Sequence, residues 1–468
     1  MAAKAYRRTI MTMNLTGKRP TFSRKGPKSK PFRVLVLLLL ILIGAWISTK
    51  IGTGSDDIIQ PLFLPTPTAT RTAESYLKEA KAFFNAGKID DPDETDAIDA
   101  YRMALDLDPE NAQGWAELAR LLTYSSNLLS TQEDRIARLE QARNAIDKAM
   151  EINPDDSNVQ AIRALVLDWS ASVATDTKQK MNWLSEAEQA AVHAYNIDPN
   201  NYLGLAFYAE VLLDRNKYSQ AEQYAHQAVT LAPNVMDTHR VYGLIMESFG
   251  NYRLAIEEYE KAAAINPNLT FLYVRIGVIY RRLKVYDSAL AYFNKAIAIN
   301  KSNGINNPIP YLGIAKTYSR TGDFFIAALN AEKALGFNPT NANTYGQLGI
   351  IYTKARNFES AMEVLKCAVQ GCTAQEAKTI LDDLMPGNTI EVNAPVQKLA
   401  LTNIAVAYYY AQYGSVLAAL SRPNQNYCPE ALSILAQVKK AFPDEPGLKG
   451  IVAENESICK MIVSTPSP

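Results

Sequence analysis

The 468-residue sequence is poor in the residues from which compact functional sites are commonly built. It contains only three histidines and four cysteines. So few histidines argue against a histidine-built metal centre, and so few cysteines exclude a small disulfide-dense scaffold. Glycine (22 residues) and proline (23) are too sparse for a collagen-like or proline-rich chain. A hydrophobic share of 48% excludes wholesale disorder.

The chain also lacks net charge, but its charges are unevenly distributed. Lys and Arg together number 48, and so do Asp and Glu. Residues 1–33 hold ten basic and no acidic side chains, which leaves 38 basic against 48 acidic side chains, or a charge of −10, in residues 34–468. This balance argues against a generally basic nucleic-acid-binding protein, so we expect no nucleic-acid partner.

A hydrophobic run follows the basic segment. Residues 34–47 carry no charge, and an extension to residue 51 crosses only Lys50. As a helix, eighteen residues span ~27 Å, which is just enough for a bilayer. The pattern predicts a transmembrane signal anchor at residues 34–51, with a basic cytoplasmic tail at 1–33 and the rest of the chain extracytoplasmic. A cleavable signal peptide, a nucleic-acid-binding basic arm and a buried core helix are the alternatives.

Residues 52–72 are rich in proline and threonine, and we interpret them as an extended linker.

The body of the chain is repetitive. One column of alanines recurs at steps of 45, 45, 34, 34, 34, 38 and 34 residues: Ala97, Ala142, Ala187, Ala221, Ala255, Ala289, Ala327 and Ala361. A second column stands seven residues after the first: Ala104, Ala149, Ala194, Ala228, Ala262, Ala296, Ala334 and Ala368. Proline follows five residues later in most units: Pro109, Pro154, Pro199, Pro233, Pro267 and Pro339.

This spacing predicts pairs of helices. Residues i and i+7 share one helix face, so paired alanines form a smooth stripe on which a neighbouring helix packs closely. Proline cannot continue a helix, so each unit ends there. A single helix–turn–helix cannot bury its apolar face alone, and the units must stack into an all-α solenoid.

The repeat resembles the tetratricopeptide repeat family, which has a 34-residue period. Two units carry the family pattern most clearly: Tyr345, Leu348, Gly349, Tyr352, Ala361, Leu365 and Ala368 in one, and Trp115, Leu118, Ala119, Leu122, Ala142, Ala149 and Pro154 in the other. The resemblance implies a right-handed helix–turn–helix solenoid of about eight units over residues 73–373. Insertions near 90–96, 123–135 and 173–181 fall between paired helices, where they either lengthen the helices or form loops.

The remaining residues are less regular. Residues 373–376 form a capping box that begins a helix, so we assign 374–398 to a capping helix and a loop. Residues 399–468 read as a degenerate repeat followed by a C-terminal capping helix, which a solenoid needs at its exposed end.

The cysteines form two candidate pairs. Cys428 lies 15 residues before Pro443, and Cys459 lies 13 residues after Pro446, so a chain reversal at 443–446 brings both to one level of two antiparallel helices. Cys367 and Cys372 flank Gly371, which can end a helix and fold the chain back. We predict disulfides within both pairs if the domain lies outside the cytoplasm; the alternative is four buried thiols.

The family resemblance implies that the first helix of each unit lines a concave groove. The places that would face a partner are Phe207, Arg240, Phe271, Arg275, Arg282, Lys316, Arg320 and Lys354. They form a basic stripe with apolar neighbours inside an acidic domain, which suits an acidic, partly hydrophobic peptide or helix. The alternative is a scattered, solvated face. The paired Lys and Asn of the family's carboxylate clamp are not reproduced.

These observations predict a membrane-anchored protein–protein interaction scaffold that acts as an assembly or tethering factor. A non-catalytic accessory subunit that presents substrate to a partner enzyme is the alternative. We predict no enzymatic activity, no catalytic residues, no cofactor and no metal site, because no nucleophile, phosphate-cradling or metal-ligand motif appears.

Overall fold

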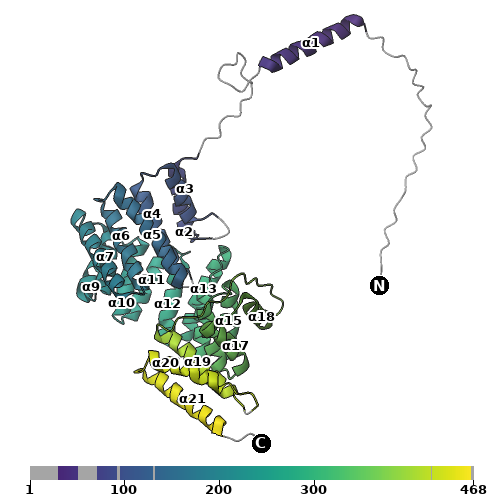
Figure 1. The fold of residues 1–468 in the computed structure, drawn as a ribbon. Coiled ribbons are helices and arrows are strands. Elements are labelled where there is room, and N and C mark those ends of the chain that lie inside the picture. Colours follow the sequence, from purple (N-terminus) through teal and green to yellow (C-terminus); the bar gives the residue numbers. More distant parts are fainter. Residues whose placement is uncertain (1–29, 51–70, 92–94, 130–131, 423, 465–468) are drawn as a thin grey trace, which may run out of the picture. The chain divides into compact units, whose positions relative to one another are not determined.

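The computed structural model describes residues 30–50, 71–91, 95–129, 132–422 and 424–464, without the side chains of 47–50 and 463–464. The chain divides into two units, residues 1–70 and 71–468, which are considered separately. The predicted tail (1–33) and linker (52–72) lie almost wholly outside the described residues. In the described residues Figure 1 shows helices and no strands.

The first unit contains one described helix, α1 (Pro31–Lys50). None of the helices in the described residues is long and apolar enough to cross a membrane. The finding overturns the predicted signal anchor at 34–51 and the single-pass membrane location inferred from it.

The second unit is an all-helical solenoid of the tetratricopeptide type. Its paired helices are α2 (Ala73–Asn85) with α3 (Ala97–Leu107), α4 (Ala112–Ser126) with α5 (Gln132–Ile152), α6 (Ser157–Val173) with α7 (Thr177–Ile197), α8 (Tyr202–Asp214) with α9 (Tyr218–Leu231), α10 (Met236–Ser248) with α11 (Tyr252–Ile265), α12 (Thr270–Arg282) with α13 (Tyr286–Ser302), α14 (Ile309–Thr321) with α15 (Phe324–Phe337), and α16 (Ala342–Lys354) with α17 (Phe358–Gln370). The insertions of the second and third units mainly lengthen helices, since α5 and α7 have 21 residues each.

The alanine columns lie where the repeat pattern predicts. Every alanine of both columns is at most 1% exposed. The first helix of a unit often carries glycine where it faces the second helix. A Cβ atom on Gly277 would lie 2.8 Å from the Phe293 ring, and a Cβ atom on Gly349 would lie 2.3 Å from Leu365. Small residues on both helices therefore set the close approach within a unit.

The proline that ends a unit also organises the next one. A side chain six residues after the proline hydrogen-bonds its carbonyl oxygen in five units: Trp115 to Pro109, Gln160 to Pro154, His239 to Pro233, Tyr273 to Pro267 and Tyr345 to Pro339, at 2.7–3.1 Å. These bonds satisfy carbonyls that the ended helix cannot use. A side chain of the following helix thereby holds the turn between two units in place.

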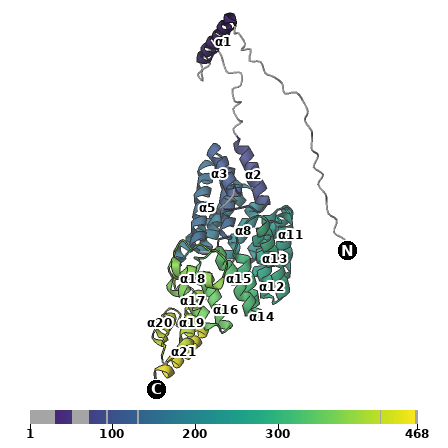
Figure 2. The same cartoon turned by 90° about the vertical axis from the view of Figure 1, so that its right-hand side faces the viewer.

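The first helix pair returns to contact the fifth and sixth pairs. Asn266 Nδ2 donates to Asn85 Oδ1 at 3.0 Å, and Asn303 Nδ2 donates to the Ala86 carbonyl at 3.0 Å. Figure 2 shows α2 beside α11. Residues separated by about 180 to 220 positions thus meet, so the N-terminal part of the solenoid curls until it closes on itself.

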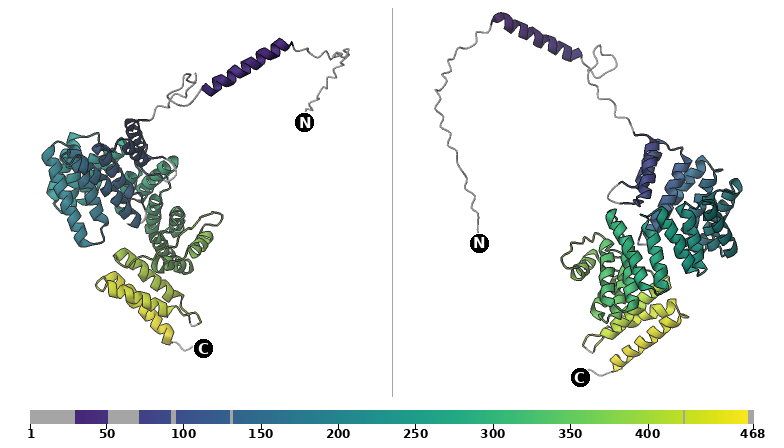
Figure 3. Two further views of the ribbon diagram at one scale, coloured as in Figure 1. Left: turned by 45° about the horizontal axis from the view of Figure 1, so that its top comes forward. Right: turned by 180° about the vertical axis from the view of Figure 1, so that it is seen from behind.

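The C-terminal part is more open and has its own hydrophobic core. After α17, the capping box of Thr373 and Glu376 begins α18 (Ala374–Leu384), which confirms that detail of the prediction. A loop returns the chain to α19 (Ile404–Leu420), α20 (Cys428–Ala441) and α21 (Pro446–Ser464), which stack at the end of the solenoid (Figure 3). The core of this part runs from Ala315 to Cys459 and is separate from that of the N-terminal units.

Candidate ligand-binding groove

The N-terminal stretch of the predicted groove is filled by the protein itself. Phe207 is completely buried, and Arg240 is only 6% exposed. Both guanidinium NH groups of Arg240 donate to Glu210, at 3.0 and 2.7 Å. The prediction that Phe207 and Arg240 face a partner is therefore wrong, because the curled solenoid packs these first helices against one another.

A polar network spans the centre of this closed part. Tyr124 and Arg120 on α4 both donate to Asp237 on α10, and the Arg120 contact is 2.9 Å. The Trp169 indole of α6 donates to Glu210 of α8 at 3.0 Å. Helices from four units thus share one buried network of the protein's own side chains.

Three further predicted residues lie at the edge of this network. Phe271 is half-buried, with its ring 6.0 Å from that of Tyr124. Arg275 donates to the buried Glu247 at 2.7 Å, and Arg282 approaches Glu247 at 4.0 Å. The charges of Arg275 and Arg282 are therefore already matched by a carboxylate of the same chain.

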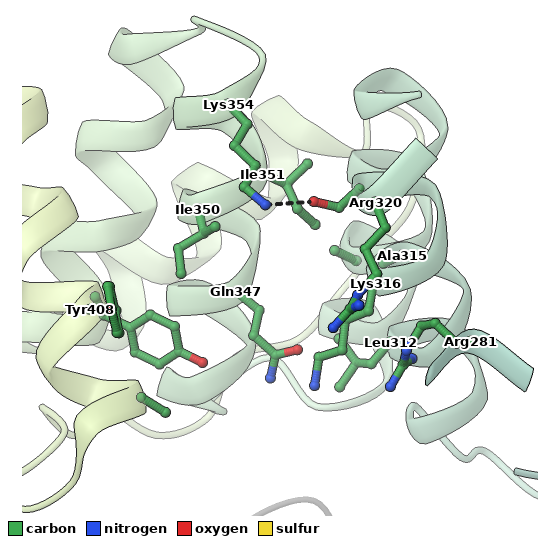
Figure 4. Close-up of a pocket in the computed structure, with 14 residues that line it drawn as sticks. Arg281, Leu312, Ala315, Lys316, Arg320, Gln347, Ile350, Ile351, Lys354 and Tyr408 are labelled. Carbon is green, nitrogen blue, oxygen red and sulfur yellow. Dashed lines mark hydrogen bonds between the residues drawn. The ribbon is translucent and has the colours of Figure 1, made fainter. Parts of the chain in front are cut away.

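The other three predicted residues lie together in an open cavity. Lys316 and Arg320 on α14, and Lys354 on α16, line a cavity of about 350 Å³ between α12, α14, α16 and α19. Arg281 on α12 lines it too, although the sequence pattern had pointed to its neighbour Arg282. We call Arg281, Lys316, Arg320 and Lys354 the cation cluster. Figure 4 shows its members on facing walls of the cavity.

Helical spacing explains how these side chains converge. Lys316 and Arg320 are four residues apart and share one face of α14, while Gln347, Ile350 and Lys354 share one face of α16. A shift of one residue along α12 turns a side chain by ~100°. That turn places Arg281 in the cavity and leaves Arg282 beside Tyr252, whose hydroxyl oxygen it contacts at 3.3 Å.

The cation cluster has no acidic counterpart in the cavity. No Asp or Glu lines the cavity, and within the described residues no carboxylate lies within 4.0 Å of any cluster member. Arg281 donates to the Gly313 carbonyl at 3.2 Å, and Lys354 lies 3.4 Å from Ser319 Oγ. Burial, and secondarily the charge of Arg320, lower the pKa of Arg281 to about 10. Burial and the charge of Arg281 lower the pKa of Lys316.

The rest of the lining is largely apolar. Leu312, Ile350 and Tyr408 are half-buried and form part of the wall. Gln347 adds a polar group whose buried Oε1 has no hydrogen-bond partner among the described residues. Tyr408 comes from α19, in the region assigned to a degenerate repeat. Tyr408 and Ala405 are three residues apart on α19 and both line the cavity. This helical spacing is the sequence feature from which Tyr408 could have been predicted as a cavity residue.

The four cysteines lie away from this cavity and form two disulfides in the structure. Cys428 and Cys459 are bonded across α20 and α21, with their Cα atoms 5.4 Å apart. Cys367 and Cys372 are bonded across the end of α17, with a Cα separation of 4.8 Å. Cys372 also exchanges two backbone hydrogen bonds with Val396, so the second disulfide sits where the loop after α18 returns.

Comparison with known proteins agrees with this architecture. The tetratricopeptide repeat family matches residues 208–270 and 272–303. Residues 208–303 thus contain tetratricopeptide repeats. Such repeats are generally non-catalytic scaffolds that mediate protein–protein binding. No curated protein matches the sequence.

Three solved structures are similar to parts of the chain, and the first two are described as tetratricopeptide repeat proteins. One is a thermophilic protein of Thermus thermophilus, with 16% identity and a TM-score of 0.36, covering 44% of this chain and 98% of that protein. Another is a tetratricopeptide repeat protein of Parabacteroides merdae, with 14% identity and a TM-score of 0.40; the match covers 63% of this chain and 99% of that protein. MamA is a third, with 18% identity and a TM-score of 0.26, covering 38% and 98%.

Proposed function

We propose that the protein is a non-catalytic scaffold that binds an acidic, partly hydrophobic peptide segment or helix of another protein in the cavity between α12, α14, α16 and α19. Its role is that of an assembly or tethering factor. The observation that carries the proposal is the cation cluster, which lines an otherwise largely apolar and uncharged cavity; no carboxylate of the described residues lines it.

Three features of the cavity support a peptide ligand. Its volume of about 350 Å³ lies within the range of ~300–1,000 Å³ that is usual for ligand sites. The apolar wall of Leu312, Ile350 and Tyr408 offers a surface for hydrophobic side chains. The cation cluster adds charged hydrogen-bond donors from Arg281, Lys316, Arg320 and Lys354 for acidic groups of the peptide.

The test uses three fluorescent peptides and the full chain. One peptide alternates glutamate and leucine, one alternates lysine and leucine, and one alternates glutamate and glycine. We expect the glutamate–leucine peptide to bind most tightly, because it alone offers both charge complementarity and apolar side chains. Its affinity should fall as salt rises from about 0.05 to 0.3 M, since the Debye screening length shortens from ~14 to ~6 Å over this range.

Two charge-reversal variants locate the binding surface. The first changes Arg281, Lys316, Arg320 and Lys354 to Glu and should abolish binding of the glutamate–leucine peptide. The matched control changes Lys81, Lys301, Lys440 and Lys460 to Glu; these lysines are exposed, line no cavity and should be dispensable. Equal binding by both variants would place the ligand elsewhere and refute the proposal.

A further inference from the structure

The cation cluster carries more positive charge than its surroundings balance. Elsewhere on the first helices of the units, arginines have a carboxylate partner: the buried Arg240 has Glu210, and the exposed Arg275 has the buried Glu247. In the cavity, Ser319, Gln347 and Tyr408 are polar but uncharged. Arg281 is half-buried and Lys316, Arg320 and Lys354 are exposed, and no carboxylate of the described residues pairs with them. The cluster is therefore a part of the groove where an anionic group of a ligand meets unpaired cations.

Three members of the cluster also lie close enough to repel one another. Arg281 is half-buried, and after burial itself the charge of Arg320 is the next cause that lowers its pKa. The charge of Arg281 in turn lowers the pKa of Lys316. Lys354 faces them from α16 (Figure 4). A bound anion would be attracted by all four cations at once.

The number of donors indicates which kind of anion fits. Two guanidinium groups offer up to five N–H donors each, and two ammonium groups offer three each. A carboxylate presents one negative charge on two oxygens, whereas a phosphoryl ester carries roughly −1.5 to −2 on three strongly accepting oxygens. Planar guanidinium forks also match phosphate geometry in a bidentate manner.

We propose that the cation cluster is a subsite for a phosphorylated side chain of the bound peptide, with an apolar residue of the same peptide against Leu312, Ile350 and Tyr408. This inference rests on the proposed function, because it names the chemistry that one part of the peptide brings to the cavity. A cavity of about 350 Å³ holds roughly ten waters. It therefore has room for a phosphoryl group together with part of an apolar side chain.

The test compares short fluorescent peptides that differ at one central position. The flanking residues are leucine and glutamate, and the central residue is serine, glutamate or phosphoserine. Polarisation with the full chain should show the phosphoserine peptide binding roughly tenfold more tightly than the glutamate peptide. Inorganic phosphate should compete only at concentrations far above that of the peptide, because it lacks the apolar contact.

Single substitutions test the assignment to the cluster. Lys316→Met should remove most of the preference for phosphoserine over glutamate. Arg282→Met is the matched control: it removes one cation from the neighbouring surface, but Arg282 does not line the cavity, so the preference should be retained. Lys316→Gln, which keeps a polar side chain, should behave as Lys316→Met does.

The melting temperature of the same variants distinguishes a ligand-binding role of Lys316 from a role in stabilising the fold. Lys316→Met should keep or raise the melting temperature of the free protein, since it relieves repulsion, while it weakens phosphopeptide binding. A large fall in the melting temperature would mean that Lys316 supports the fold and would count against the subsite.

The outcomes separate this inference from the proposed function. Equal affinity for the phosphoserine and glutamate peptides overturns the phosphoryl subsite and leaves the acidic-peptide scaffold standing. Inorganic phosphate that competes at the concentration of the peptide would mark a site for free anions and would also overturn the inference. If none of the acidic peptides binds, the proposed function fails as well.

Discussion

At single positions, the size of one side chain decides how closely two helices approach, and Phe293 is the clearest case. Its ring lies on α13, fully buried between Gly277 of α12 and Gly313 of α14. A Cβ atom would lie 2.8 Å from the ring at Gly277 and 2.6 Å at Gly313. Phe293 with Ala289 and Ile314 forms a small core of its own. Glycine at both positions is therefore a packing requirement of this joint.

We predict that Gly277→Ala destabilises the protein by ~1–3 kcal/mol, because the new methyl group overpacks an aromatic ring that has no free space. Gly336→Ala is the matched control. Gly336 is also helical, but its Cβ would meet only ordinary contacts at 3.6 Å, so alanine should stabilise the helix by ~0.5–1 kcal/mol. Urea unfolding of the two variants measures the change in the free energy of unfolding. A change of the same sign in both variants would contradict the packing described for Phe293.

A second residue-scale prediction concerns Asp168, which is buried at the rim of the central network. Burial first, and then the charges of Asp214 and Glu210, raise its pKa well above the usual range, although Arg240 and Lys180 oppose this. Similar causes raise the pKa of Asp214 to about 6. An acid with a raised native pKa binds protons more tightly when folded, so its contribution to stability is lost as pH rises.

The free energy of unfolding should therefore decline as pH rises from about 4 through the native pKa values of this pair. Asp168→Asn should flatten this decline and raise stability at neutral pH by roughly 1–3 kcal/mol, since Asp168 Oδ1 lacks a hydrogen-bond partner in the described structure. Denaturant titrations at several pH values measure the slope. Asp444→Asn, at an almost fully exposed side chain, should leave it unchanged.

At the scale of elements, helices α20 and α21 depend on a covalent link. Both Cys428 and Cys459 are completely buried, and their bond closes a loop over 31 positions. Helices α19, α20 and α21 pack against one another. The end of the solenoid thus combines a short stack with a disulfide.

We predict that changing Cys428 and Cys459 to Ser costs about 3–4 kcal/mol in the chain-entropy description of disulfides. Hydrogen exchange should accelerate in α20 and α21 before it does so in α4 to α11. The disulfide between Cys367 and Cys372 closes a loop over only five positions. Changing these two cysteines to Ser should therefore cost less, roughly 2 kcal/mol. Free thiols at Cys428 and Cys459 in natively extracted protein, detected by mass spectrometry, would contradict the bond.

At the scale of the whole solenoid, closure of the N-terminal part determines which surface stays open. The contacts of Asn85 and Ala86 with the fifth and sixth units hold the first helix pair in place. Closure buries the concave face from α4 to α10 and leaves the cavity next to α16 and α19 as the accessible part of the groove. The position of the ligand site therefore follows from contacts far away from it.

We predict that Asn266→Ala together with Asn303→Ala weakens this closure. Each lost hydrogen bond contributes about 1 kcal/mol to the closed form. If closure protects the amides of α2, the double variant loses about 2 kcal/mol of this protection, and hydrogen exchange in α2 should be roughly thirtyfold faster. Asn330→Ala is the control, because its side chain bonds only the Ile326 carbonyl within α15. Unchanged exchange in α2 of the double variant would show that other contacts maintain the closed form.

The repeat, the helix pairs and the buried alanine columns could be predicted from the amino-acid sequence, because these features follow from local periodicity. The sequence also placed Lys316, Arg320 and Lys354 on the first helices of their units. It misjudged Phe207 and Arg240, because the number of units needed for closure depends on small rotations that add up from pair to pair. Arg281 was missed for a similar reason, since one residue of helical phase decides between the cavity and the neighbouring surface. Curvature is a property of the assembled stack, and only the tertiary structure could decide which part of the groove the protein fills itself and which part it leaves open.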